Sequence, residues 1–142
     1  MPLISFGSIL SFAEELEKRD ESFYAAAAAN PAFAEHKDLF DRFLKDTRKN
    51  IHNVQRTRRE NVTEMILEPV KDFTRAPFCE TIDPAAAKNN AEILEAARCL
   101  EKRTERYYIE ASEKIKALPE VSRALKTIGK NHTTHLRKLD AL

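Results

Sequence analysis

Residues 13–24 read AEELEKRDESFY, and residues 97–108 read ARCLEKRTERYY. Seven of the twelve positions are identical in the two segments: the first Ala, the block Leu-Glu-Lys-Arg, a later Glu and the final Tyr. A chain that carries the same charged, helix-favouring segment twice is expected to consist of two related helical hairpins. The alternative is a chance similarity, because charge-rich helices share much of their composition.

The composition of the whole chain favours an all-α protein. Of the 142 residues, 33% are charged and 42% hydrophobic, with two glycines and no tryptophan. A low glycine content, together with abundant Ala, Leu, Glu, Lys and Arg, is typical of helical proteins. The net charge of +1 gives no overall electrostatic preference for nucleic acid, so we expect no nucleic-acid partner.

The sequence also predicts where the protein resides. No stretch approaches the roughly 20 apolar residues that a membrane-spanning helix needs. The N-terminus lacks a basic region and turns acidic at once, unlike a signal peptide. Cys79 and Cys99 are isolated, which excludes a cysteine-based zinc or iron site and favours free thiols. We therefore expect a small soluble cytoplasmic protein without a membrane partner.

Hydrophobic periodicity predicts four helices. Inward-facing residues recur at steps of three and four in the segments 8–29, 32–62, 84–117 and 119–142. Asp83 followed by Pro84 is typical of a helix start, so it is expected to cap the third helix.

The links between these helices predict their connectivity. Short links join the first helix to the second and the third to the fourth, whereas about twenty residues, 63–83, separate the second from the third. Short links make antiparallel neighbours, and a long crossover lets the third helix run parallel to the second. We therefore predict that residues 1–142 form one ferritin-like four-helix bundle of two hairpins joined by a crossover.

Two glutamates occupy core positions of the repeated helices. Glu17 and Glu101 lie on the inward stripes of their helices, and Tyr24 and Tyr108 follow them by seven residues. Seven residues are two helical turns, roughly 10 Å along the axis, so each pair shares a face. A buried carboxylate is costly unless it is paired or binds a metal. We expect the tyrosine hydroxyls to hydrogen-bond the glutamates.

Two histidines occupy core positions of the last helix. His132 and His135 continue the apolar stripe of this helix rather than its polar face. This placement disfavours an interpretation of them as solvated residues near a helix C-terminus. Histidines that face buried carboxylates are candidate metal ligands.

The chain resembles the rubrerythrin-like branch of the ferritin-like superfamily. The resemblance rests on the motif L-E-x-x-x-x-x-F/Y-Y in the first and third helices and on a histidine-bearing helix after each. The family pattern, Glu, E-x-x-H, Glu and E-x-x-H on successive helices, binds two metal ions. By position, Glu17 and Glu101 match the two single glutamates, and His135 matches the last histidine.

The chain departs from the family pattern in ways that predict a degenerate di-metal site. His132 stands where the family has Glu, and Thr47 and Asn50 stand where the second helix has Glu and His. His52 would be the alternative ligand, but it lies off the inward stripe. The paired C-x-x-C motifs of rubrerythrin are missing, so we expect no rubredoxin-type iron centre and no haem. A redox cycle would then require an external electron donor.

We predict at most one divalent ion, Fe, Mn or Zn, bound by Glu101, His132 and His135. Glu17 is either a fourth ligand or the acceptor of a histidine N–H. The alternative is a metal-free polar layer in which protonated histidines pair with Glu17 and Glu101 and in which Thr47 and Asn50 complete the hydrogen bonding.

Two classes of function follow. The resemblance implies a metal-binding protein with a role in iron, redox or oxidative-stress chemistry. The alternative is a non-catalytic helical interaction module whose partner surface is the crossover or the polar end of the second helix. The crossover packs either on its own bundle or on a second copy in a homodimer, because it carries six large apolar residues: Met65, Ile66, Leu67, Val70, Phe73 and Phe78.

Overall fold

The computed structural model describes residues 6–60, 73–79 and 82–142. Four long helices dominate this part of the chain, which confirms the all-α prediction. Within the described residues, no helix combines the length and the apolar character that crossing a membrane requires. The long helices are α1 (Phe6–Ala29), α2 (Lys37–Glu60), α3 (Asn90–Lys114) and α4 (Pro119–Asp140), and the short 3-10 helices are η1 (Pro31–His36), η3 (Ala76–Phe78) and η4 (Pro84–Ala86).

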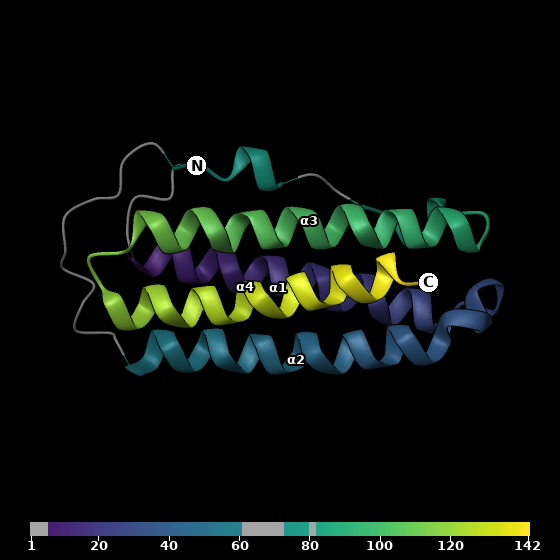
Figure 1. Cartoon of the computed structure of the whole chain (residues 1–142), viewed down its shortest axis with the longest axis horizontal. Coiled ribbons are helices and arrows are strands. Elements are labelled where there is room, and N and C mark those ends of the chain that lie inside the picture. Colours follow the sequence, from purple (N-terminus) through teal and green to yellow (C-terminus); the bar gives the residue numbers. More distant parts are fainter. Residues whose placement is uncertain (1–5, 61–72, 80–81) are drawn as a thin grey trace.

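The four long helices form a bundle of two hairpins (Figure 1). The most extensive contacts lie within the hairpins, between α1 and α2 and between α3 and α4. The hairpins meet through α1 with α3 and through α2 with α4. Helices α2 and α3 run in one direction along the bundle, and α1 and α4 run in the other. This arrangement confirms the predicted four-helix bundle with its long crossover.

The second and third helices both begin later in the chain than predicted. The residues before α2 form η1, because Phe33 has non-helical backbone angles of φ −114° and ψ 23°. Asp83 accepts a hydrogen bond from the Ala85 N–H and caps η4 rather than the third helix. The side chain of Asn89 accepts from the Glu92 N–H and caps α3 instead. The predicted start of the third helix at Pro84 was therefore wrong.

The core consists of two apolar clusters separated by a polar layer. One cluster surrounds Tyr107, and the other surrounds Phe40 and Phe43. Phe73 and Phe78 of the crossover are buried in the first cluster, with ring centroids 5.6 and 5.1 Å from that of Tyr107. These two residues therefore pack on their own bundle, whereas the other apolar crossover residues lie outside the described part: Met65, Ile66, Leu67 and Val70.

Candidate metal centre

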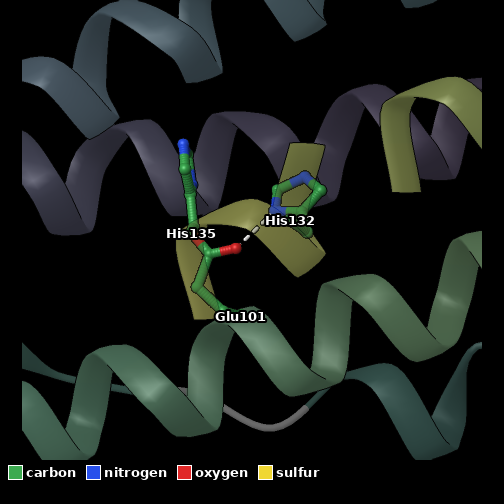
Figure 2. Close-up of side chains that lie close together, drawn as sticks. All are labelled: Glu101, His132 and His135. Carbon is green, nitrogen blue, oxygen red and sulfur yellow. Dashed lines mark hydrogen bonds and ion pairs between the residues drawn. The ribbon is translucent and has the colours of Figure 1, made fainter. Parts of the chain in front are cut away.

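The polar layer brings the four predicted ligand residues together in the middle of the bundle. Glu17 comes from α1, Glu101 from α3, and His132 and His135 from α4. All four are buried, with at most 1% of each residue exposed. Figure 2 shows Glu101 with its carboxylate directed between the two histidines. The prediction that each of these residues faces the core is therefore confirmed.

Glu101 lies at the centre of this layer, because both histidines turn the same ring nitrogen towards it. Nδ1 of His132 lies 2.6 Å from Oε2 of Glu101, and Nδ1 of His135 lies 2.8 Å from Oε1. The three side chains offer ligand atoms that all lie within 4.8 Å of one another. One carboxylate and two imidazoles form a donor set suited to Fe(II), Mn(II) or Zn(II). The residues present therefore fit a single divalent ion.

The opposite nitrogen of each ring contacts a second carboxylate. Nε2 of His132 lies 2.6 Å from Oε2 of Glu17, and Nε2 of His135 lies 3.0 Å from Oδ2 of Asp46. In metal sites of proteins, a ligating histidine commonly donates its other N–H to a carboxylate, which fixes its tautomer and orientation. Glu17 and Asp46 are placed for this role, which leaves Nδ1 of each ring to face Glu101.

The two repeated helices exchange hydrogen bonds between their tyrosines and glutamates. The Tyr24 hydroxyl donates to Glu101 at 2.5 Å, and the Tyr108 hydroxyl donates to Glu17 at 2.9 Å. Burial and the adjacent glutamate raise the pKa of each tyrosine well above 10, so both hydroxyls stay protonated. The predicted tyrosine–glutamate hydrogen bonds are confirmed, and they cross between α1 and α3.

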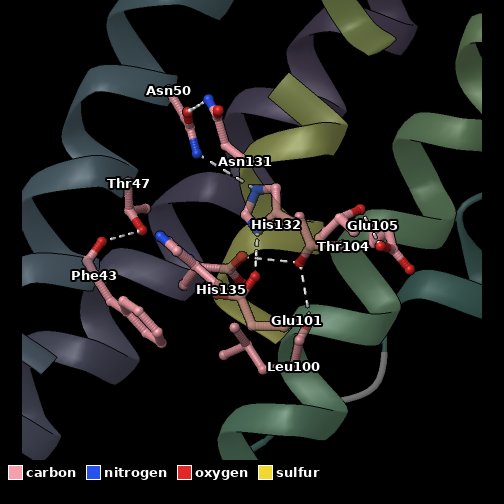
Figure 3. A network of polar contacts seen from close by, with 12 residues as sticks. Phe43, Thr47, Asn50, Leu100, Glu101, Thr104, Glu105, Asn131, His132 and His135 are labelled. Carbon is pink, nitrogen blue, oxygen red and sulfur yellow. Dashed lines mark hydrogen bonds and ion pairs between the residues drawn. The ribbon is translucent and has the colours of Figure 1, made fainter. Parts of the chain in front are cut away.

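Helix α2 contributes an amide to the layer where the family pattern has a histidine (Figure 3). The side chain of Asn50 donates to Glu17 at 3.2 Å and accepts from Asn131 at 2.9 Å. The hydroxyl of Thr47 donates to the Phe43 carbonyl of its own helix at 2.8 Å. Asn50 therefore completes the layer as predicted, but the prediction that Thr47 does so was wrong. His52 is exposed, in agreement with its exclusion as a ligand.

A buried acid on α1, Asp20, was missed in the sequence. It accepts hydrogen bonds from Arg103 at 2.5 Å and from the Thr104 hydroxyl at 2.8 Å. Asp20 also lies near Glu17 and His132, and these three residues form a second group with metal-ligand spacing. A guanidinium already occupies the Asp20 carboxylate, so the first group is the better cation site. The signal was present, because position 20 continues the inward steps from position 17.

Asp46 was also missed, and its role could not be read from periodicity. It stands on the flank of α2, and about 34% of its side chain is exposed. Its contact with His135 depends on how α4 packs against α2. Asp46 is therefore the part of this histidine–carboxylate network that reaches the surface.

The buried charges shift one another's pKa values. Burial alone raises the pKa of Glu101, but the charges and hydrogen bonds of His132 and His135 outweigh burial and lower this pKa to about 2. Burial likewise opposes the charged form of His132, yet Glu17 and Glu101 raise its pKa well above 6.5. In the metal-free protein His132 is therefore an imidazolium that donates to both glutamates.

One comparison with known proteins agrees with this fold. A family model described as a ferritin-like domain matches residues 7–141. The chain therefore belongs to the ferritin-like domain family. No curated protein and no solved structure matches the chain significantly. Together, the family and the buried Glu and His residues fit a generic ferritin-like protein. Its core contains a group of side chains that could hold a metal ion.

Proposed function

We propose that the protein binds one divalent metal ion in its bundle core through Glu101, His132 and His135. The observation that carries the proposal is the convergence of two Nδ1 atoms, at 2.6 and 2.8 Å, on one buried carboxylate. Nδ1 of His132 carries a proton in the metal-free protein, and a metal ligand must be deprotonated. Metal binding is therefore expected to release protons.

The stoichiometry of one ion follows from what α2 supplies. Beside Glu17 it offers the amide of Asn50, which is a weak ligand for a divalent cation. Thr47 directs its hydroxyl to its own helix. Asp20, the other acid near Glu17, is paired with Arg103. Glu17 accordingly acts as the acceptor of the His132 Nε2–H rather than as part of a second site.

The resemblance to rubrerythrin extends the proposal to iron or redox chemistry. A redox-active ion would supply one-electron chemistry in a buried site, and Tyr24 and Tyr108 would hold the glutamates in place by hydrogen bonds. The chain has only two cysteines, which are free, exposed and too few to bind a four-cysteine iron centre. Electrons would therefore come from an external donor protein.

A second candidate function is a structural one without metal. The raised pKa of His132 favours it, because the imidazolium satisfies Glu17 and Glu101 without any ion. The layer would then be a buried ion-pair network that specifies the packing of the four helices. Under this alternative, the family's metal site persists as a polar core, and the protein acts as an interaction module.

Thermal unfolding with and without added Fe(II), Mn(II) or Zn(II) separates the two candidates. A ligand that binds only the folded state stabilises it by about 2.7 kcal/mol at a concentration of 100 times Kd. We expect such a shift in the parent protein, its loss in His135→Ala, and its retention in His52→Ala. His52 is the matched control because it is an exposed histidine outside the layer. A parent protein that shows no shift with any of the three ions would support the metal-free candidate.

A further inference from the structure

The near-neutral net charge of the chain conceals a strong division between pairs of helices. Helix α2 has eight basic and four acidic residues, and α4 has five basic and two acidic. Helix α1 has two basic and five acidic residues, and α3 has five basic and six acidic. Helix α2 lies beside α4 (Figure 1), so the excess of basic residues on these two helices lies along one side of the bundle.

The positive charges on this side recur at a fixed interval. Each helix carries three exposed cations spaced by seven residues, which is two helical turns, or about 10.5 Å. Within the described residues, none of the six makes an ion pair, whereas Lys18 and Arg19 of α1 pair with Glu14 and Glu15. We call these six residues the basic face: Arg42, Lys49 and Arg56 of α2, with Arg123, Lys130 and Arg137 of α4.

The two rows of the basic face are in register. The Asn131 side chain of α4 donates to the Asn50 side chain of α2 at 2.9 Å, which places these residues at the same level of the bundle. Lys130 and Lys49 are their chain neighbours, so the central cations of the two rows also share a level. Helices α2 and α4 run antiparallel (Figure 1), so a position after Lys49 matches the level of one before Lys130. By this register Arg56 pairs in level with Arg123, and Arg42 with Arg137.

The basic face lies on the same two helices as the surface end of the buried network. Asp46 of α2 is partly exposed where α2 meets α4, and its carboxylate is held by Nε2 of His135 of α4 at 3.0 Å. A partner bound on this face would cover the point at which the network of His135 and Glu101 reaches solvent. The surface is thus distinguished by its unpaired charge and by its position over the site.

We propose that the basic face docks an acidic helix of a partner protein. Carboxylates that recur every seven residues on a helix match the spacing of both rows, and complementary charge steers such a partner into register. A protein partner is favoured over nucleic acid because Asp46 lies within the face and the α1 side of the bundle is acidic. Both features repel a continuous polyanion. This inference does not depend on whether the core binds a metal.

The test uses a synthetic helical peptide as a defined probe. The peptide carries glutamate at two positions of each seven-residue repeat, and a second peptide of the same composition has its glutamates scrambled. Fluorescence anisotropy is measured at about 0.1 M and about 1 M salt, where the Debye length falls from about 10 Å to about 3 Å. We expect the periodic peptide to bind more tightly than the scrambled one and to dissociate at high salt.

Charge-reversal variants locate the binding surface. Lys49→Glu/Lys130→Glu is expected to weaken binding of the periodic peptide at least about tenfold, through loss of charge complementarity. Lys102→Glu/Lys114→Glu makes the same change of charge at exposed positions of α3 and is expected to have little effect. Circular dichroism verifies that both variants are folded.

Three results would overturn the proposal. Equal binding of the scrambled peptide would mean that the face selects charge alone. Tighter binding of a DNA duplex of matched charge would indicate nucleic acid as the partner. An absence of peptide binding at low salt would mean that the basic face is simply a solvated surface.

Discussion

The two hairpins of the bundle are alike in their first helices and different in their second. Helices α1 and α3 place a glutamate and a tyrosine at equivalent positions, and each tyrosine donates to the glutamate of the other helix. Helix α4 then adds His132 and His135, whereas α2 adds the amide of Asn50 beside Glu17 and the carboxylate of Asp46 beside His135. Glu101 therefore meets two imidazoles, and Glu17 meets one imidazole and an amide.

This difference shows that two related hairpins can keep the same helix arrangement while only one of them, α3 with α4, supplies the proposed metal ligands. The glutamate–tyrosine exchange holds α1 against α3 and does not require a metal. The second helix of each hairpin determines whether a carboxylate becomes part of a cation site. Changes to the polar residues that α2 and α4 add should therefore alter how many ions are bound, whereas loss of the tyrosine hydroxyls of α1 and α3 should lower stability.

The largest effect is expected from restoring the second half of the family pattern. Thr47→Glu/Asn50→His gives α2 an E-x-x-H sequence beside Glu17, as in di-metal bundles. We expect the number of ions bound per chain to rise from one to two by elemental analysis. His52→Ala, which changes an exposed histidine of the same helix, is the control. A stoichiometry that stays at one would show that more than these two ligands separates the hairpins.

The two glutamates should differ in what their loss costs. In metal-free protein at neutral pH, Glu101→Gln leaves two histidines facing a neutral amide, and breaking a buried ion pair costs about 3–5 kcal/mol. Glu17→Gln breaks the buried ion pair with His132 at 2.6 Å but leaves Glu101 to pair with that imidazolium, so we expect a smaller loss of about 1.5–3 kcal/mol. Urea unfolding in the presence of a chelator measures both values. A larger loss for Glu17→Gln would reverse the proposed asymmetry.

The pH dependence of the metal-free protein should reflect His132 and Glu101. The raised pKa of His132 adds stability below its ordinary value of 6.5, and this is lost as the pH rises through the raised value. The slope for one proton is at most about 1.4 kcal/mol per pH unit. The lowered pKa of Glu101 adds stability above 4.5 that is lost as the pH falls towards about 2.

Measuring the free energy of unfolding across this pH range checks which group causes each loss of stability. His132→Gln is expected to remove the loss at alkaline pH, and His52→Ala is expected to keep it. If His132→Gln still loses stability at alkaline pH, another group is responsible for that loss.

The smallest effects are expected from the two tyrosines. Tyr24→Phe and Tyr108→Phe each delete one hydroxyl that donates to a buried carboxylate, worth about 1.5 kcal/mol. Because the two hydrogen bonds occupy equivalent places in the repeat, the two losses should be similar. Both losses are measured by urea unfolding with chelator. Unequal losses would mean that the difference between α2 and α4 also affects the hydrogen bonds between α1 and α3.

Much of the fold could be predicted from the sequence, because periodicity and link length act locally. The inward stripes of α1 and α4 place Glu17, His132 and His135 correctly. The start of the third helix could not be placed, because Asp83–Pro84 and Asn89 are both good caps. The geometry that ends η4 at Ala86 then determined which cap α3 uses.

The site was predictable only where its residues follow the inward phase. Asp20 fits that phase and could have been found as the missing step between Glu17 and Tyr24. Asp46 lies on the flank of α2, and only the packing of α4 brings His135 within 3.0 Å of it. Thr47 has the inward phase but forms its hydrogen bond within its own helix. Phase alone therefore does not determine where a hydroxyl points.

The most direct test of a one-sided metal centre is elemental analysis of untagged protein purified without chelator. We expect about one Fe, Mn or Zn per chain in the parent, the same in His52→Ala, and none in His132→Ala/His135→Ala. Two ions per chain in the parent would contradict the asymmetry between the hairpins. No metal in the parent would contradict the site itself and leave the layer as a buried ion-pair network.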